Sequence, residues 1–144
     1  MKALWMTIGG LVVLAGTVGF QARTQEAAGS RSIQDHVYSA EQAEAGQAVF
    51  EERCYICHVP EQFVGAAYMD GWATQSADDF IEFVRTSMPE DNPGSLKRSD
   101  YVAIFAYILS LNGIPAGETP LDEDSDVLKS VLIEGPFSNE PAAP

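Results

Sequence analysis

Apolar side chains recur at helical spacing in three stretches of the chain, and each stretch predicts a helix. The first follows Ser39, a favourable helix N-cap, and carries Ala45, Val49 and Phe50 on one face. Gly46 lies beside this face, where the missing side chain would let another helix come close. A glycine that is merely tolerated at the surface is the alternative interpretation.

The second predicted helix begins at Ser76 and ends before Pro89, because proline cannot continue a helix. Phe80, Phe83 and Val84 form its apolar side. This helix is therefore expected to lie with one side on a core and the other in water.

Residues 101–111 are the most apolar stretch after residue 20, and their apolar side chains cover more than half of a helical circumference. They predict a third, well-buried helix. Residues 59–72 have no clean period and predict a loop, whereas residues 127–133 fit a helix or a packed strand equally well. The predicted fold class is all-α, with about three main helices and irregular loops.

The N-terminus has the features of a targeting segment. Lys2 precedes an uncharged run that reaches Phe20, which gives the basic and apolar regions of a secretory signal. The run also reaches the lower length limit of a membrane-spanning helix. We therefore predict that residues 1–28 are a signal peptide or an N-terminal membrane anchor, with cleaved export favoured. Either one places the rest of the chain outside the cytoplasm.

Composition divides the remaining chain into three parts. We predict a polar linker over residues 29–38 and a folded domain over residues 39–121. Residues 122–144 are predicted to be an acidic C-terminal extension with a disordered tail.

Charge limits the possible partners. The chain has 21 acidic and 8 basic residues, and its net charge is -13 at pH 7. Nucleic acid is not expected as a partner, because the sequence has no basic patch. The acidity either favours a protein partner with a positively charged face or simply keeps the protein soluble.

The segment Cys54-Tyr55-Ile56-Cys57-His58 has the spacing of a c-type haem attachment site. Its two thiols are spaced to add to the two vinyl groups of one porphyrin, and His58 follows as an axial ligand of the iron. A zinc site would need about four nitrogen or sulfur ligands, and the chain has no other cysteine and only one other histidine, His36. A thioredoxin-type disulfide would need a helix that starts at the motif, whereas here a helix ends there.

Three side chains are candidates for the sixth ligand of the iron. Met88 stands at the end of a predicted helix and before Pro89, where irregular backbone would let its thioether reach the iron. Met69 is interpreted as lining of the haem pocket, and His36 lies in the predicted linker. The alternatives to ligation by Met88 are a core methionine and an open sixth site.

These features together resemble a class I c-type cytochrome: Gly46, Phe50, the motif of residues 54–58, Met88-Pro89 and Tyr107. The resemblance covers residues 39–121. It implies an all-α fold, one haem c bound covalently through Cys54 and Cys57, and axial ligation of its iron by His58 and Met88. It also implies that Phe50 and Tyr107 meet where the first and last helices cross.

The closing stretch, residues 85–121, is similar to the cytochromes that accompany pyrroloquinoline-quinone-dependent dehydrogenases. This similarity implies an electron carrier, not an enzyme, that passes electrons from a periplasmic quinoprotein toward the respiratory chain. The implied partners are that dehydrogenase and a terminal oxidase or another cytochrome. The implied location is the periplasm, with the membrane involved only if residues 1–28 are retained as an anchor of the inner membrane.

Two departures from the family pattern change these expectations. Val59-Pro60-Glu61 stands where the family has a glycine-rich segment, so Pro60 is the candidate for the backbone carbonyl that holds His58. Lys97 and Lys129 are the only lysines of the sequence after the N-terminal segment, so a lysine-rich docking surface of the mitochondrial type is not expected.

Two alternatives to a free one-electron carrier stay open. The chain could be a dedicated cytochrome subunit of a dehydrogenase complex, with residues 118–133 lying along the partner. It could also be a haem enzyme or gas sensor with an open sixth site.

Overall fold

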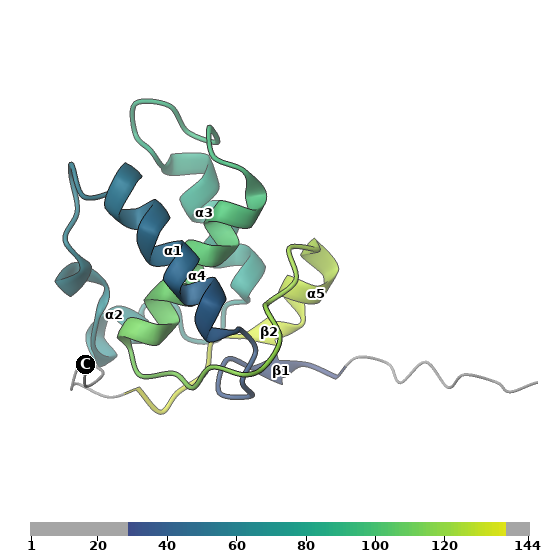
Figure 1. The fold of residues 1–144 in the computed structure, drawn as a ribbon. Helices are drawn as coiled ribbons and strands as arrows, with labels where there is room; N and C mark the ends of the chain where they lie inside the picture. Colours follow the sequence, from purple (N-terminus) through teal and green to yellow (C-terminus); the bar gives the residue numbers. More distant parts are fainter. Residues whose placement is uncertain (1–28, 138–144) are drawn as a thin grey trace, which may run out of the picture.

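A computed structural model describes residues 29–137, so the predicted signal peptide or anchor, residues 1–28, lies outside the described part of the chain. Helices dominate, and the all-α prediction is confirmed (Figure 1). No helix within residues 29–137 is long and apolar enough to cross a membrane. In chain order the elements are β1 (Arg31–Ser32), α1 (Ala40–Arg53), the 3-10 helix η1 (Pro60–Phe63), α2 (Ala66–Asp70), α3 (Ala77–Ser87), α4 (Arg98–Leu111), α5 (Ser125–Lys129) and β2 (Val131–Leu132).

The two predicted helix starts are confirmed by their capping hydrogen bonds. The Ser39 hydroxyl accepts from the backbone N–H of Gln42 at 3.2 Å. The Ser76 hydroxyl accepts from the N–H of Asp79 at 3.1 Å, and the Asp79 carboxylate accepts from the N–H of Ser76 at 2.9 Å. These bonds satisfy N–H groups that have no partner inside the helix, and so they fix where α1 and α3 begin.

Helix α1 crosses α4 in close contact (Figure 1). A Cβ atom at Gly46 would overlap the backbone carbonyl of Ala103, so the predicted close approach is confirmed. The rings of Phe50 and Tyr107 lie 5.6 Å apart at the same crossing, as the resemblance implies. The first and third predicted helices therefore pack directly on each other.

The buried face of α1 differs from the predicted one. Ala45 is exposed and Val49 is half-buried, whereas Ala43, Gly46 and Phe50 are buried. The true face follows the spacing of three and four residues, but two of its members are small. Alanine and glycine give little hydrophobic signal, and for that reason the pattern of larger side chains indicated a different face.

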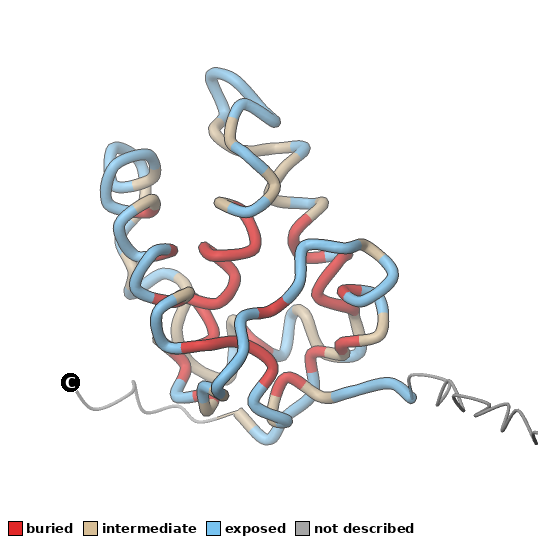
Figure 2. Tube along the Cα trace, turned by 45° about the vertical axis from the view of Figure 1, so that its right-hand side comes forward, coloured by how far each residue is buried: buried red, intermediate tan, exposed pale blue. Residues whose placement is uncertain are grey.

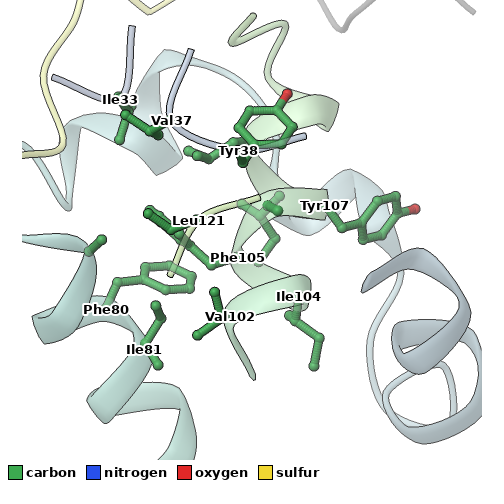
Figure 3. Packing of buried hydrophobic residues seen from close by; sticks show 14 of the residues in the cluster. Ile33, Val37, Tyr38, Phe80, Ile81, Val102, Ile104, Phe105, Tyr107 and Leu121 are labelled. Carbon is green, nitrogen blue, oxygen red and sulfur yellow. The ribbon is translucent and has the colours of Figure 1, made fainter. Parts of the chain in front are cut away.

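The second side of α4 packs against α3. Phe80 of α3 and Phe105 of α4 have ring centroids 5.0 Å apart, and Figure 3 shows them within the apolar cluster that also contains Ile81 and Val102. Figure 2 shows that buried residues are concentrated in the middle of the molecule, with exposed segments around them. Helix α4 is thus buried between its neighbours, as predicted.

The prediction of a linker over residues 29–38 is not met. Ile33, Val37 and Tyr38 are buried in the core, and β1 pairs with β2 in parallel, with Arg31 opposite Val131. The Tyr38 hydroxyl donates to the carbonyl of Ile114 at 2.6 Å, and burial raises the pKa of Tyr38 to about 12. This segment is therefore part of the fold and not a spacer in front of it.

The predicted C-terminal extension also contributes to the core. Leu128, Val131 and Ile133 are completely buried, and the N–H of Ile133 donates to the carbonyl of Gln75 at 2.8 Å. The apolar stretch 127–133 supplies both the end of a helix and a strand, so both interpretations of it hold in part. Residues 138–144, where the tail was predicted, lie outside the described residues.

A cluster of ion pairs ties α3, α4 and the C-terminal segment together. Arg98 donates to Asp78 at 2.8 Å, to the hydroxyl of Ser125 at 2.9 Å, and to Glu82. Glu82 also accepts from Arg85, and the hydrogen bond from Arg85 is the main reason why the pKa of Glu82 is lowered to about 2. Arg98 thereby fixes how α3 lies relative to α4.

Candidate functional site

Helix α4 borders a cavity of about 860 Å³. Tyr101, Ile104 and Ile108 of α4 line it at helical spacing, and Phe80 and Val84 of α3 also line it. Cofactor sites are typically concave, mainly apolar and about 300–1,000 Å³ in volume. The cavity therefore has the size and chemistry of a site for a large apolar group.

The cysteine motif follows directly after α1 and borders this cavity. The N–H of Cys54 donates to the carbonyl of Phe50 at 2.8 Å, and the N–H of His58 donates to the carbonyl of Cys54 at 2.9 Å. This tight turn places Cys54, Cys57 and His58 together in the cavity lining. Both thiols are free, and burial raises the pKa of Cys54, with Arg53 opposing that effect. Because α1 ends at the motif, the arrangement is not that of a thioredoxin-type site.

A glutamine side chain holds the ring of His58. Gln62 Oε1 accepts from the backbone N–H of Val59 at 3.1 Å, which fixes the orientation of the amide, because a backbone N–H only donates. The same oxygen lies 3.3 Å from His58 Nδ1. This contact requires the tautomer that carries its proton on Nδ1, and that tautomer leaves Nε2 free to bind a metal.

Gln62 was not found by sequence reasoning, which expected the carbonyl of Pro60 at this place. The structure instead makes Pro60 the first residue of η1, and Gln62 reaches back from the third position of that short helix. A proline followed two positions later by glutamine is the signal that could have indicated it, since a side chain at the third position often caps the first turn.

Asn112 is a second residue whose role the sequence did not reveal, because it was interpreted only as a helix stop. Its amide donates to the carbonyl of Phe63 at 2.8 Å, and its oxygen accepts from the N–H of Gly65 at 2.8 Å. The side chain is buried and also donates to the carbonyl of Ile108. Asn112 therefore fastens the segment after the motif, where η1 and α2 replace the predicted loop, to the end of α4.

Met88 borders the same cavity as the cysteine motif. It ends α3, where its N–H donates to the carbonyl of Val84 at 2.7 Å, and it is half-buried. Met69 and His36, the other two candidates, are not among the residues that line the cavity. Met69 is only 2% exposed and belongs to the core, so its interpretation as pocket lining is wrong. His36 is exposed and contacts the carbonyl of Ala116 instead.

Aromatic side chains form much of the remaining wall. Trp72 packs edge to face on Phe80 at 4.6 Å and on Phe83 at 5.4 Å, and all three line the cavity. Tyr68 lies on another part of the wall, and burial raises its pKa to about 12, so its hydroxyl stays neutral. The exposed acids at the rim are Glu52, Glu90 and Asp91.

These residues fit a covalently attached haem. Two thiols, an imidazole with a free Nε2 and a thioether are the side chains that attach and ligate haem in c-type cytochromes, and here they all line one apolar cavity. The fit depends on the donor set and on the aromatic wall together, because either alone would suit other ligands.

Comparison with known families agrees with this chemistry. Residues 41–108 match the model of the family described as cytochrome c oxidase, cbb3-type, subunit III. The matched stretch runs from the first turn of α1 to the last part of α4, and so it contains the cysteine motif and Met88. No curated protein and no solved structure matches the chain.

Proposed function

We propose that this chain, whose residues 41–108 form a c-type cytochrome domain, is a carrier of single electrons with one covalently attached haem. The family implies haem c, its iron and haem-based electron transfer. One observation carries the proposal: the cavity lining brings Met88, from the end of α3, together with the motif that follows α1.

Four residues would hold the group. Cys54 and Cys57 would carry the thioether bonds, and His58 and Met88 would be the axial ligands. When bound, haem supplies a one-electron couple at its iron, with a potential that methionine and histidine ligation raises. The chain contributes fixed ligands and an apolar wall that excludes water, and neither requires a catalytic group of its own.

We further propose that the redox partner presents a positively charged surface. Glu52, Glu90 and Asp91 are exposed at the rim of the cavity, and the chain as a whole carries a net charge of -13. Charges of this kind steer transient partners and make the association rate fall as salt is added. An electron-transfer rate that does not change with ionic strength would contradict this part of the proposal.

The donor and the location remain proposals from the sequence. The closing stretch favours a periplasmic quinoprotein dehydrogenase as donor and a terminal oxidase or another cytochrome as acceptor. Residues 1–28 would direct the domain to the periplasm or anchor it there. Fractionation of cells, followed by copurification from the periplasmic and membrane fractions, tests both statements.

The alternative of a dedicated subunit had the C-terminal segment lying along a partner. In the structure Leu128, Val131 and Ile133 of this segment are buried against the domain itself, which favours the free carrier. The alternative of an open sixth site is opposed by the presence of Met88 in the cavity lining.

Absorption spectra of the purified protein, oxidised and reduced, test the assignment of the ligands. We expect a low-spin, methionine-ligated spectrum for the natural protein and loss of the methionine signature in Met88→Ala. The reduced variant should also bind carbon monoxide more readily. An unchanged spectrum in Met88→Ala would refute ligation by Met88.

A further inference from the structure

Tyr101 contributes a hydroxyl group to the otherwise mainly apolar wall of the cavity. It lies in the first turn of α4 and is only 1% exposed. Its hydroxyl donates to the backbone carbonyl of Met88 at 2.9 Å and is approached by the N–H of Leu96 at 3.4 Å. One buried hydroxyl thus contacts both ends of the loop that joins α3 to α4.

The rest of this loop has few other attachments. Residues 90–95 are exposed, and Figure 1 shows the loop projecting beyond the ends of α3 and α4. Its internal hydrogen bonds are local, such as that from the N–H of Asn92 to the carbonyl of Pro89 at 2.9 Å. Besides Tyr101, the loop is anchored by the last hydrogen bond of α3, between Met88 and Val84, and by the packing of Leu96 on the core. Where α4 begins, the N–H of Lys97 also donates to the Asp100 carboxylate at 3.2 Å.

We propose that Tyr101 is a positioning residue for Met88. By holding the Met88 carbonyl against α4, its hydroxyl limits how far the Met88 backbone moves, and so it sets how easily another ligand displaces the thioether from the iron. Loss of the hydroxyl would leave the carbonyl and the Leu96 N–H without this partner and would let the loop open locally at lower cost. This role depends on the proposed function, because it requires Met88 to be the sixth ligand.

The matched pair of variants is Tyr101→Phe and Tyr107→Phe. Both remove one hydroxyl from a buried ring of α4, but Tyr107 packs on Phe50 at the crossing with α1 and does not line the cavity. Imidazole is titrated into the oxidised, haem-loaded proteins. Binding is followed by the main visible absorption band of the haem in every variant, and also by the near-infrared absorption of methionine-ligated ferric haem where Met88 is present. We expect Tyr101→Phe to bind imidazole up to about tenfold more tightly, as expected for loss of the hydrogen bonds of one hydroxyl, and Tyr107→Phe to match the natural protein.

A double-mutant cycle shows whether the effect passes through Met88. In the Met88→Ala background, Tyr101→Phe should no longer change the affinity for imidazole, because the displaced ligand is already absent. Equal imidazole binding by Tyr101→Phe, Tyr107→Phe and the natural protein overturns the role of Tyr101. So does an effect of Tyr101→Phe that persists in full without Met88, since it would reflect a general loosening. If instead Met88→Ala alone changes neither the spectrum nor imidazole binding, ligation by Met88 fails, which is a different result.

Discussion

Two sides of α4 differ in what packs against them. On one side Ala103 and Tyr107 are covered by Gly46 and Phe50 of α1, so the polypeptide itself fills the space. On another side the wall that includes Tyr101, and to which Phe50 also contributes, borders a cavity of about 860 Å³. One side of α4 is therefore packed by another helix, whereas another side borders a cavity that suits a prosthetic group. The difference teaches that the first side determines the fold, whereas the second determines the function.

The largest effect is expected from a substitution that would push α1 away from α4. In Gly46→Val the new side chain would overlap the backbone carbonyl of Ala103, which no rotamer change relieves. We expect the free energy of unfolding to fall by about 3 kcal/mol or more, as for severe overpacking of a core. Denaturant unfolding of the haem-loaded protein measures it. Ala45→Val, an exposed change on the same helix, is the control, and equal losses would contradict the close crossing.

The stability of the cavity side of α4 should depend on the attached haem. In Cys54→Ser combined with Cys57→Ser, we expect no haem to remain with the chain on a denaturing gel. Because the haem would fill the apolar cavity only in the folded state, the variant without haem should also have a lower free energy of unfolding than the haem-loaded protein. Haem that stays covalently attached to this variant would contradict the assigned attachment site.

The fold was predictable to the extent that a residue acts within its own helix. Ser39 and Ser76 gave the helix starts because their capping partners are three residues away. The pairing of β1 with β2 was not predictable, because each strand has two residues and they are about a hundred positions apart. No local pattern records a contact of that kind.

The residues of the candidate site were likewise predictable only in part. Cys54, Cys57 and His58 are defined by their spacing alone, and the methionine expected from the sequence lines the same cavity. Tyr101 was not predicted because it acts through hydrogen bonds to the loop before its helix. Gln62 contacts residues only three and four positions away, but it lies in a stretch that was predicted as an irregular loop and not as a capped turn. Tyr101 in particular has the hydrophobic pattern of an ordinary core residue, and only its hydroxyl distinguishes it.

An intermediate effect is expected where α3 is held beside the cavity. Arg98→Met removes the partner of Asp78, a nearly buried carboxylate, together with one partner of Glu82. We expect a loss of about 2 kcal/mol in the free energy of unfolding, since hydrogen bonds to charged groups are the stronger ones. Arg85→Met, which breaks only the more exposed pair with Glu82, should cost less than about 1 kcal/mol. Equal costs for the two variants would show that Arg98 does not fix α3.

Acid should weaken the ion pairs of Glu82 that help to hold α3 beside α4. The pKa of Glu82 is lowered from its ordinary value of 4.5 to about 2, mainly by Arg85 and also by Arg98. A carboxyl whose folded pKa is depressed stabilises the fold above its unfolded pKa, and this contribution disappears as the pH falls through the folded value. The stability advantage of the natural protein over Glu82→Gln should therefore be present at neutral pH and shrink between about pH 4.5 and pH 2. Thermal unfolding at several pH values measures it, and a constant difference across that range would contradict the shift.

The smallest effect is expected next to the cysteine motif, where Gln62 Oε1 lies 3.3 Å from His58 Nδ1. An acceptor at Nδ1 makes the imidazole a more basic ligand, which favours ferric over ferrous iron. Gln62→Leu should therefore raise the midpoint potential, by less than the roughly 59 mV that a tenfold change in a one-electron equilibrium represents. Gln47→Leu, on the exposed face of α1, removes a glutamine that bonds only to the side chain of Glu51 and should leave the potential unchanged. Gln62→Glu keeps the cap on Val59 and strengthens the acceptor, so it should lower the potential. If Gln62→Leu lowers thermal stability but neither Gln62 variant changes the potential, Gln62 only caps η1, and the ring of His58 is held without it.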